Sequence, residues 1–317
     1  MLGVLIGLAA GVAMPLQTSV NGKLGDNVKS PYISTLVSFT GGIILALCIV
    51  FATSGSIAIP FSTIAKEPLW IWMGGFCGTV LVLISIICLP VLGSTETMVI
   101  YVLGQIFTGL VIDTFGLFKT DAIPLTAFRI AGIALVFAGS IIVAVANAAP
   151  KASAEKEEKQ DKPNVMIYRI GIFISGVLAA IQIAVNGRLG QVTGHPFKAT
   201  AVSMLVGFIS IAIIIAALCI FKGGTKGIID DKLPGGKVKW WMCTGGVFAM
   251  IIVGGNVVIA QTLGAGLSLI LNVTGQTLGG IVVDATGFLG IEKKPVTVKK
   301  IAAVLLMIAG IALVKLF

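Results

Sequence analysis

Ala149–Pro163 reads APKASAEKEEKQDKP and is the one long stretch without an apolar segment in a 317-residue chain whose mean hydropathy is +1.07. A charged run of this kind buries too little apolar surface to order itself, so we interpret residues 149–165 as a solvated linker. The sequences on either side of it repeat each other. Gln17–Gly25 reads QTSVNGKLG, and Gln182–Gly190 reads QIAVNGRLG, 165 positions later.

A second motif recurs further along each half. Gly104–Gly116 reads GQIFTGLVIDTFG, and Gly275–Gly287 reads GQTLGGIVVDATG, 171 positions later. Two motifs repeated in the same order indicate one structural unit that occurs twice. We therefore predict two domains, residues 1–148 and residues 166–317, joined by the linker.

Hydropathy divides each half into five apolar runs of about 20 residues, the length that crosses a bilayer as a helix. With 57% hydrophobic and only 11% charged residues, the chain differs from an ordinary soluble domain. Because five is an odd number, the second half must enter the membrane upside down. We predict an all-α integral membrane protein with ten transmembrane helices in two five-helix inverted repeats. The predicted spans are residues 2–20, 33–53, 69–90, 96–116, 125–147, 167–185, 198–221, 240–262, 265–287 and 297–316.

The basic residues orient this topology, because cytoplasmic loops of membrane proteins carry an excess of lysine and arginine. Of the 22 basic residues, 16 fall on the linker's side of the predicted membrane and 6 on the other side. We therefore expect a cytoplasmic linker and both termini outside. The first half alone is nearly unbiased, so the linker and the second half impose this orientation.

Several function classes are excluded by what the sequence lacks. The net charge of +9 comes without a basic stripe interleaved with aromatic residues, so we assign it to loops facing an anionic leaflet and predict no nucleic-acid partner. No G-x-S-x-G, H-E-x-x-H or G-x-x-x-x-G-K-[ST] motif occurs, so we predict no enzyme activity, no cofactor, and no nucleotide-driven pump unless a partner brings the nucleotide site.

Metal binding is not expected either. The five cysteines lie in apolar runs without C-x-x-C spacing, and we interpret them as buried small hydrophobic residues. The single histidine, His195, has no second ligand at metal-binding spacing and is interpreted as a loop residue.

A polar stripe recurs on the fourth and ninth predicted helices, where Gln105 precedes Asp113 and Gln276 precedes Asp284 by about two turns. Gln105 falls near mid-helix and so near the bilayer midplane, where an unpaired amide costs free energy. Two interpretations stay open. The glutamines hold helices together across a glycine-lined contact, or they line a central cavity at the interface of the repeats.

A second pair of amides recurs on the first and sixth helices. Gln17 and Asn21, like Gln182 and Asn186, are spaced i, i+4 and share a helix face. Asn-Gly followed by a basic residue is typical of a helix C-terminus, so we expect both asparagines to end their helices. That role does not account for the glutamines one turn inside. We take all four residues, with Gln105 and Gln276, as candidates for a substrate path.

Three acidic residues are candidates for a proton or ion site, because an ionisable group in or near a membrane span is functional by default: Glu96, Asp113 and Asp284. Asp113 and Asp284 lie close to helix ends, where capping the next segment is the alternative role. Glu96 begins the fourth helix and has no symmetric counterpart, because Leu267 stands at the repeated position.

These motifs resemble the drug/metabolite transporter superfamily, and more closely its bacterial YdcZ-type branch. The resemblance rests on PLQTSVNGKLG at Pro15–Gly25 and on G-Q-x-x-x-G-L-x-I-D-x-F-G-L-F at Gly104–Phe118, and it covers essentially the whole chain. It implies the fused two-half form of an inner-membrane, inverted-repeat transporter. Small multidrug transporters of this superfamily carry a glutamate in their first helix. Here that helix offers only Gln17 and Asn21, so antiport through such a glutamate does not carry over.

We therefore predict a secondary transporter, an exporter that moves a small metabolite or drug-like molecule across the bacterial inner membrane by alternating access between the repeats. Its expected partners are the lipid bilayer, the small-molecule substrate and a coupling ion, for which H⁺ and Na⁺ are the candidates. Two alternatives stay open. One is a non-transporting membrane scaffold or subunit, and the other is a membrane-embedded enzyme, which the missing catalytic residues disfavour.

Overall fold

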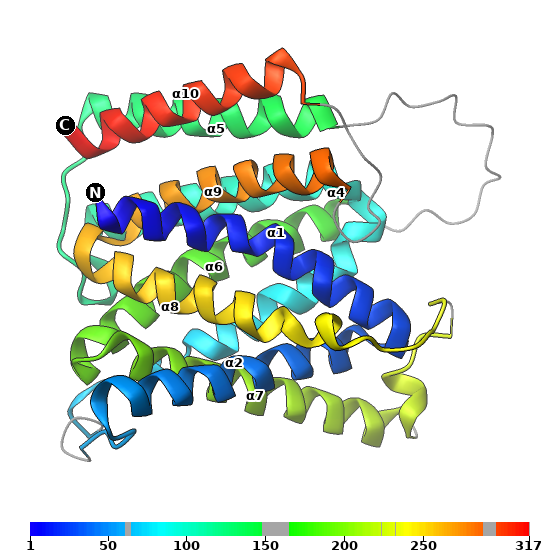
Figure 1. Ribbon diagram of the computed structural model, residues 1–317. Coiled ribbons are helices and arrows are strands. Elements are labelled where there is room, and N and C mark those ends of the chain that lie inside the picture. Colours follow the sequence, from blue (N-terminus) through cyan, green and yellow to red (C-terminus); the bar gives the residue numbers. More distant parts are fainter. Residues whose placement is uncertain (61–64, 148–164, 223, 232, 288–295, 317) are drawn as a thin grey trace, which may run out of the picture.

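The computed structural model describes residues 1–60, 65–147, 165–222, 224–231, 233–287 and 296–316, so most of the predicted linker lies outside it. Within these residues the chain is helical, without strands. The helices run side by side, with both chain termini at one end of the molecule (Figure 1). They are α1 (Leu2–Val28), α2 (Pro31–Ser54), α4 (Gly74–Phe115), α5 (Ala127–Asn147), α6 (Val165–Thr193), α7 (Pro196–Phe221), α8 (Gly245–Leu263), α9 (Ala265–Thr286) and α10 (Val298–Leu316).

The helices have the length and surface of membrane spans. Seven segments of the described chain are long and apolar enough to cross a bilayer, and two shorter apolar helices accompany them. Large apolar side chains such as Leu5, Phe51 and Ile213 are more than half exposed on the bare protein. A surface of this kind is stable against lipid rather than water. The prediction of an all-α membrane protein is thus confirmed at this level.

The element α4 contains 42 residues, and a straight helix of that length would measure about 63 Å. Yet Trp70, before its start, and Phe118, after its end, pack edge to face with ring centroids 5.3 Å apart. The chain therefore doubles back within α4, and Figure 1 shows the return at the linker end. We expected two spans separated between residues 90 and 96. No separate loop interrupts the helix there, but its apolar segments, Gly74–Ser85 and Thr97–Phe115, lie on either side of that boundary as expected.

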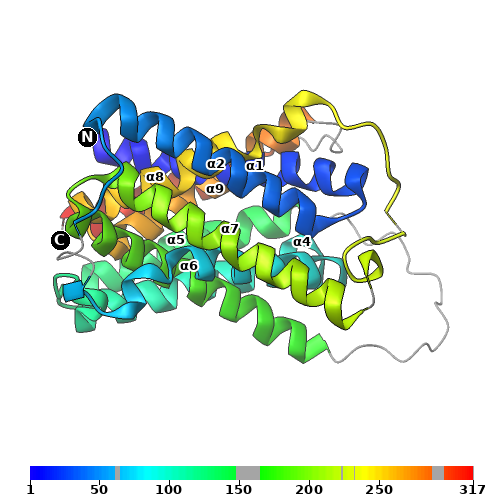
Figure 2. The same cartoon turned by 90° about the horizontal axis from the view of Figure 1, so that it is seen from below.

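Helices of one half pack mainly on helices of the other. The main pairs are α1 with α9, α4 with α6, α2 with α7, and α5 with α10. Figure 2 shows α2 and α7 side by side on one face. Glycines permit the closest approaches: a Cβ on Gly11 of α1 would lie 2.7 Å from the Cα of Gly275, and one on Gly176 of α6 would lie 3.1 Å from the Cα of Gly104. Such close contact is how helices gain packing energy in lipid.

The expected helix ends at Asn21 and Asn186 were wrong, because α1 continues to Val28 and α6 to Thr193. The helices stop where the backbone turns left-handed, at Lys29 (φ 56°) and at Gly194 (φ 64°). A proline follows two residues after each and begins the next helix. The Asn-Gly pairs are therefore interior positions of their helices.

Candidate functional site

The repeated asparagines occupy equivalent places at opposite ends of the molecule. Asn21 on α1 lies against Gly245, the first residue of α8, and Asn186 on α6 lies against Gly74, the first residue of α4. A Cβ on either glycine would overlap the asparagine Oδ1, so only glycine admits these amides. Both Oδ1 atoms are buried without a hydrogen-bond partner. The asparagines therefore keep an unused acceptor where two helices meet.

The two glutamines one turn earlier differ in their contacts. The Nε2 of Gln17 donates to Ser38 Oγ at 3.2 Å and to the carbonyl of Gly245 at 3.4 Å, so it bridges α1, α2 and α8. Gln182 instead lies against Gly78 on α4. Gln17 therefore has the bridging role that we considered as an alternative for the glutamines of α4 and α9.

Gln105 and Gln276 do not have the partners that a bridging role requires. Gln105 is 2% exposed, and its Oε1 is buried without a partner. The buried Nε2 of Gln276 also lacks one. Tyr101, one turn before Gln105 on α4, likewise has a buried, unpartnered hydroxyl. Each such atom costs roughly 1–3 kcal/mol in the folded state, so these groups are better suited to binding a polar molecule than to joining helices.

Sequence reasoning missed Tyr101, although a signal was present. The residue 171 positions later is Asn272, which is 1% exposed and donates from Nδ2 to Asn256 Oδ1 at 2.6 Å. A polar residue at the same place in both repeats, four positions before each glutamine, could have indicated the site.

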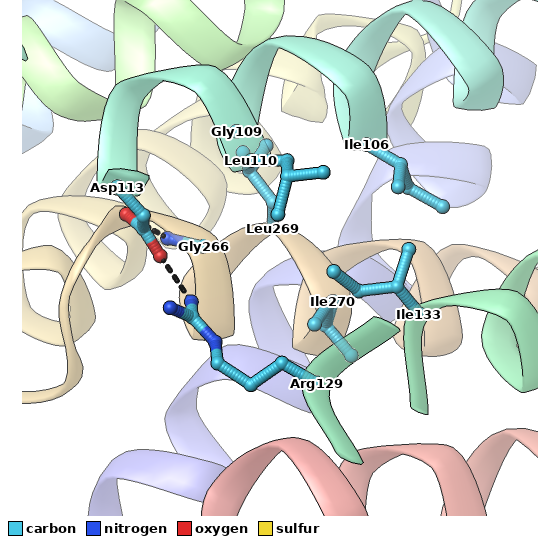
Figure 3. Close-up of a pocket in the computed structure, with 9 residues that line it drawn as sticks. All are labelled: Ile106, Gly109, Leu110, Asp113, Arg129, Ile133, Gly266, Leu269 and Ile270. Atoms are coloured by element: carbon cyan, nitrogen blue, oxygen red, sulfur yellow. Dashed lines mark hydrogen bonds and ion pairs between the residues drawn. The ribbon is translucent and has the colours of Figure 1, made fainter. Parts of the chain in front are cut away.

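Asp113 forms a buried ion pair instead of an open ion site. Its Oδ2 lies 2.7 Å from Arg129 Nη2, and its Oδ1 accepts from the backbone N–H of Gly266 at 3.0 Å (Figure 3). The side chains of Asp113 and Arg129 are 1% and 5% exposed, respectively. Asp113 therefore neutralises Arg129 and caps the N-terminus of α9. We expected Asp113 to cap the next segment, and it instead caps α9, a helix of the other half of the chain.

A cavity of about 10 Å³ adjoins this pair, at the lower limit of what one water molecule needs.

Sequence reasoning missed Arg129 by counting it as a loop charge. The signal was Lys300, which stands 171 positions later and is 1% exposed. The side chains of Glu96 and Asp284 lie outside the described part of the structure, so their candidacy stays a prediction.

The linker-side end of α1 and the opposite end of α6 carry the same motif in different surroundings. Thr18 is exposed, whereas Ile183, at the repeated position, is 4% exposed. A Cβ on Gly22 would meet nothing within 4 Å, whereas one on Gly187 would lie 2.7 Å from the Cβ of Ala260. Ile183 and Gly187 are thus packed where the equivalent residues of α1, Thr18 and Gly22, are exposed.

Helix contacts differ in the same way. In addition to α4, α6 packs along α8 and α9. The first-half counterparts of α8 and α9 are the two segments of α4. The equivalent contact would therefore join α1 to α4, where the described residues form no extended interface. The equivalent helices therefore do not occupy equivalent environments.

An ion cluster covers the packed end. Glu67 Oε1 lies 2.9 Å from Arg188 Nη2, and Glu67 Oε2 lies 3.1 Å from Lys119 Nζ. Burial alone would raise the pKa of the Glu67 carboxyl, but the hydrogen bonds and positive charges of Lys119 and Arg188 more than offset it and hold that pKa below its ordinary value. Lys23, which repeats Arg188 on α1, is exposed.

Comparison with known proteins gives a family and a fold. A family model described as "Putative inner membrane exporter, YdcZ" matches the chain in two segments, residues 2–142 and 167–313. One solved structure, titled "Crystal structure of protein", is 15% identical, with a TM-score of 0.68, over 99% of this chain and 96% of its own. At that identity the likeness shows the fold alone. No curated protein matches the chain significantly.

Proposed function

The chain belongs to the YdcZ family of inner-membrane proteins, and from that premise we propose that it is a secondary transporter that exports a small metabolite or drug-like molecule. In this proposal ten helices form two inverted five-helix repeats, and the protein alternates between states open to either side. In this proposal the linker is cytoplasmic, and the exposure of Thr18 supports a state that is open to the cytoplasm.

The observation that supports alternating access best is the unequal environment of Thr18 and Ile183. In an inverted repeat, exchanging the conformations of the two halves turns a state open on one side into a state open on the other. One structure then has equivalent positions packed in one half and exposed in the other, as these two are. A static scaffold has no need of this difference.

The substrate path in this proposal runs between the open end and the unpartnered amides. Gln105 contributes an acceptor near the middle of the Thr97–Phe115 segment of α4, and Gln276 contributes a donor near the middle of α9. Asn21 and Asn186 contribute acceptors at the two ends. No charge is required of these groups, so a substrate is held by hydrogen bonds. Asp113 is proposed as structural, because Arg129 and Gly266 already use its oxygens.

Reciprocal accessibility tests the proposal. In a cysteine-free background, Thr18→Cys and Ile183→Cys are each labelled with a water-soluble maleimide. Cys48 and Cys243 must be replaced for this, because both are exposed, contrary to our expectation of buried cysteines. We expect Thr18→Cys to react and Ile183→Cys to be protected. A transported substrate should lower the first rate and raise the second. The substrate is sought in proteoliposomes with metabolites and cationic drugs, with and without a pH gradient.

Failure of the exchange has a defined meaning. If neither rate responds to any compound or gradient, the scaffold alternative is favoured and the transporter proposal is wrong. Orientation is tested separately with a single cysteine at Ser153 in the linker. An impermeant reagent that labels it in intact cells would contradict the cytoplasmic placement.

A further inference from the structure

We propose that Glu67 is the residue that holds the end opposite the linker closed, and hence a positioning residue for the transport cycle. The inference rests on the proposed function, but it concerns a residue outside both repeated motifs. Glu67 precedes η1 (Leu69–Trp72), and its carboxylate joins the end of α6 to the segment that follows α4. The closed end therefore depends on one acid shared by two cations.

The electrostatics of the cluster make the acid the critical member. The Glu67 side chain is 12% exposed and pairs with Arg188, which is 24% exposed, and with Lys119, which is 51% exposed. Arg188 also donates to Gln191 at 3.3 Å, so it is held in place on α6. Without the carboxylate the two cations would repel each other across the contact that Glu67 now closes. Losing either cation would still leave one ion pair.

Backbone geometry shows that the segment beyond α4 needs to be held. Phe118 and Lys119 both adopt the left-handed conformation, each with φ 59°. Two consecutive non-glycine residues in this region are strained, and such strain persists only where surrounding contacts over-determine it. The ion pair of Lys119 and the packing of Phe118 on Trp70 are the contacts that do so here.

The held segment covers the packed end of α6. Phe118 packs against the buried cluster that contains Ile112, Ile183 and Ala184. Release of Lys119 would free Phe118 to leave this cluster and would open the stripe of α6 that includes Ile183. In this way an ion pair at the surface is connected to the position whose burial distinguishes the two ends.

We call the ion cluster of Glu67, Arg188 and Lys119 the lock, and among the described residues it occurs at one end only. The residue 171 positions after Glu67 is Val238, which is 50% exposed, and the repeat counterpart of Arg188 is the exposed Lys23. Among the described residues, no carboxylate occupies this equivalent position near the linker-side end. The proposal therefore predicts that the state open on the linker side predominates without substrate.

Maleimide labelling of Ile183→Cys measures the lock directly. Glu67→Gln keeps the size of the side chain and removes its charge. We expect it to speed labelling of Ile183→Cys at least about tenfold, the factor that corresponds to one lost hydrogen bond to a charged group. Labelling of Thr18→Cys should slow in the same variant. Glu67→Asp should restore part of the protection, which loss of packing alone would not explain.

Two further variants complete the test. Asp231→Asn removes the acid of an exposed pair at the linker end, Lys29–Asp231 at 3.6 Å, and should leave both rates unchanged. Lys119→Gln changes a half-exposed residue and should speed Ile183→Cys labelling in the same direction but less. If folded Glu67→Gln and Lys119→Gln both label at the wild-type rate, the lock does not exist.

Failure of the lock is distinguishable from failure of the proposed function. Substrate-driven exchange of the two labelling rates in wild-type protein, together with unchanged rates in Glu67→Gln, would overturn the lock and leave transport standing. Faster labelling in Glu67→Gln without any substrate response in wild-type protein would support the lock and overturn transport.

Discussion

The linker-side end of α1 and the opposite end of α6 start from almost the same sequence and finish in different environments. Asn-Gly-basic-Leu-Gly is common to both, yet Gly187 is packed and Gly22 is open. Two residues outside that motif accompany the difference. Glu67 pairs with Arg188, the basic residue of this motif on α6. Pro15 lies inside α1 where α6 has Ala180. The repeat thus specifies a helix, and its surroundings decide how the helix packs.

The largest expected effect comes from breaking the buried ion pair between Asp113 and Arg129. Arg129→Met leaves Asp113 buried and uncompensated beside the first turn of α9, so we expect a loss of about 3–5 kcal/mol in the free energy of unfolding. The double variant Asp113→Leu, Arg129→Met should recover much of it, because neither charge is then left alone. Denaturant unfolding in detergent measures both. Equal stability of the single variant and wild type would show that the pair is not structural.

The second prediction compares the two glycines directly. Gly187→Ala places a methyl group 2.7 Å from Ala260 and should destabilise the protein by about 1–3 kcal/mol, the range for overpacking. Gly22→Ala meets open space and should change stability by about 0.5 kcal/mol or less. Thermal unfolding of the purified variants measures the difference. Equal effects of the two substitutions would mean that the two ends are equally packed in solution.

Much of this architecture could be predicted from the sequence, because apolar length and repetition are properties of the chain itself. The helical membrane fold and the likeness to the YdcZ family followed from hydropathy and from the two motifs. The Asn21 prediction failed for a physical reason. An Asn-Gly pair ends a helix when its glycine adopts the left-handed conformation, and here that turn lies at Lys29 instead. The ion pair of Glu67 with Arg188 joins residues 121 positions apart, which no local pattern reveals. Arg129 lies only 16 positions from Asp113, but neither Arg129 nor Glu67 is part of the two motifs.

The third prediction concerns the pH range over which the closed end survives. Because the pKa of Glu67 is lowered, its ion pairs contribute fully above the ordinary value near 4.5 and are lost only as the pH falls through the lowered pKa. Ile183→Cys carrying a spin label should therefore keep the same mobility from pH 8 to about pH 5 and loosen only below about pH 4. A change near neutral pH would contradict the assignment of the closed end to Glu67.

The smallest expected effect is that of Pro15→Ala, which gives α1 the residue that α6 has. Proline lacks the N–H that would bond to the carbonyl of Gly11, so α1 has a weak point between its packed half and its open half. Alanine restores that hydrogen bond and should stabilise the protein by about 0.5–1 kcal/mol. If the proline lets the linker-side half of α1 move independently, labelling of Thr18→Cys should also slow severalfold, because a stiffer α1 follows α9 more closely.

Leu16→Ala, a neighbouring change that leaves the backbone bonds intact, is the control. Unchanged Thr18→Cys labelling in a stabilised Pro15→Ala variant would show that the proline does not cause the exposure of Thr18. The ion pairs of Glu67 would then be the main difference between the two ends.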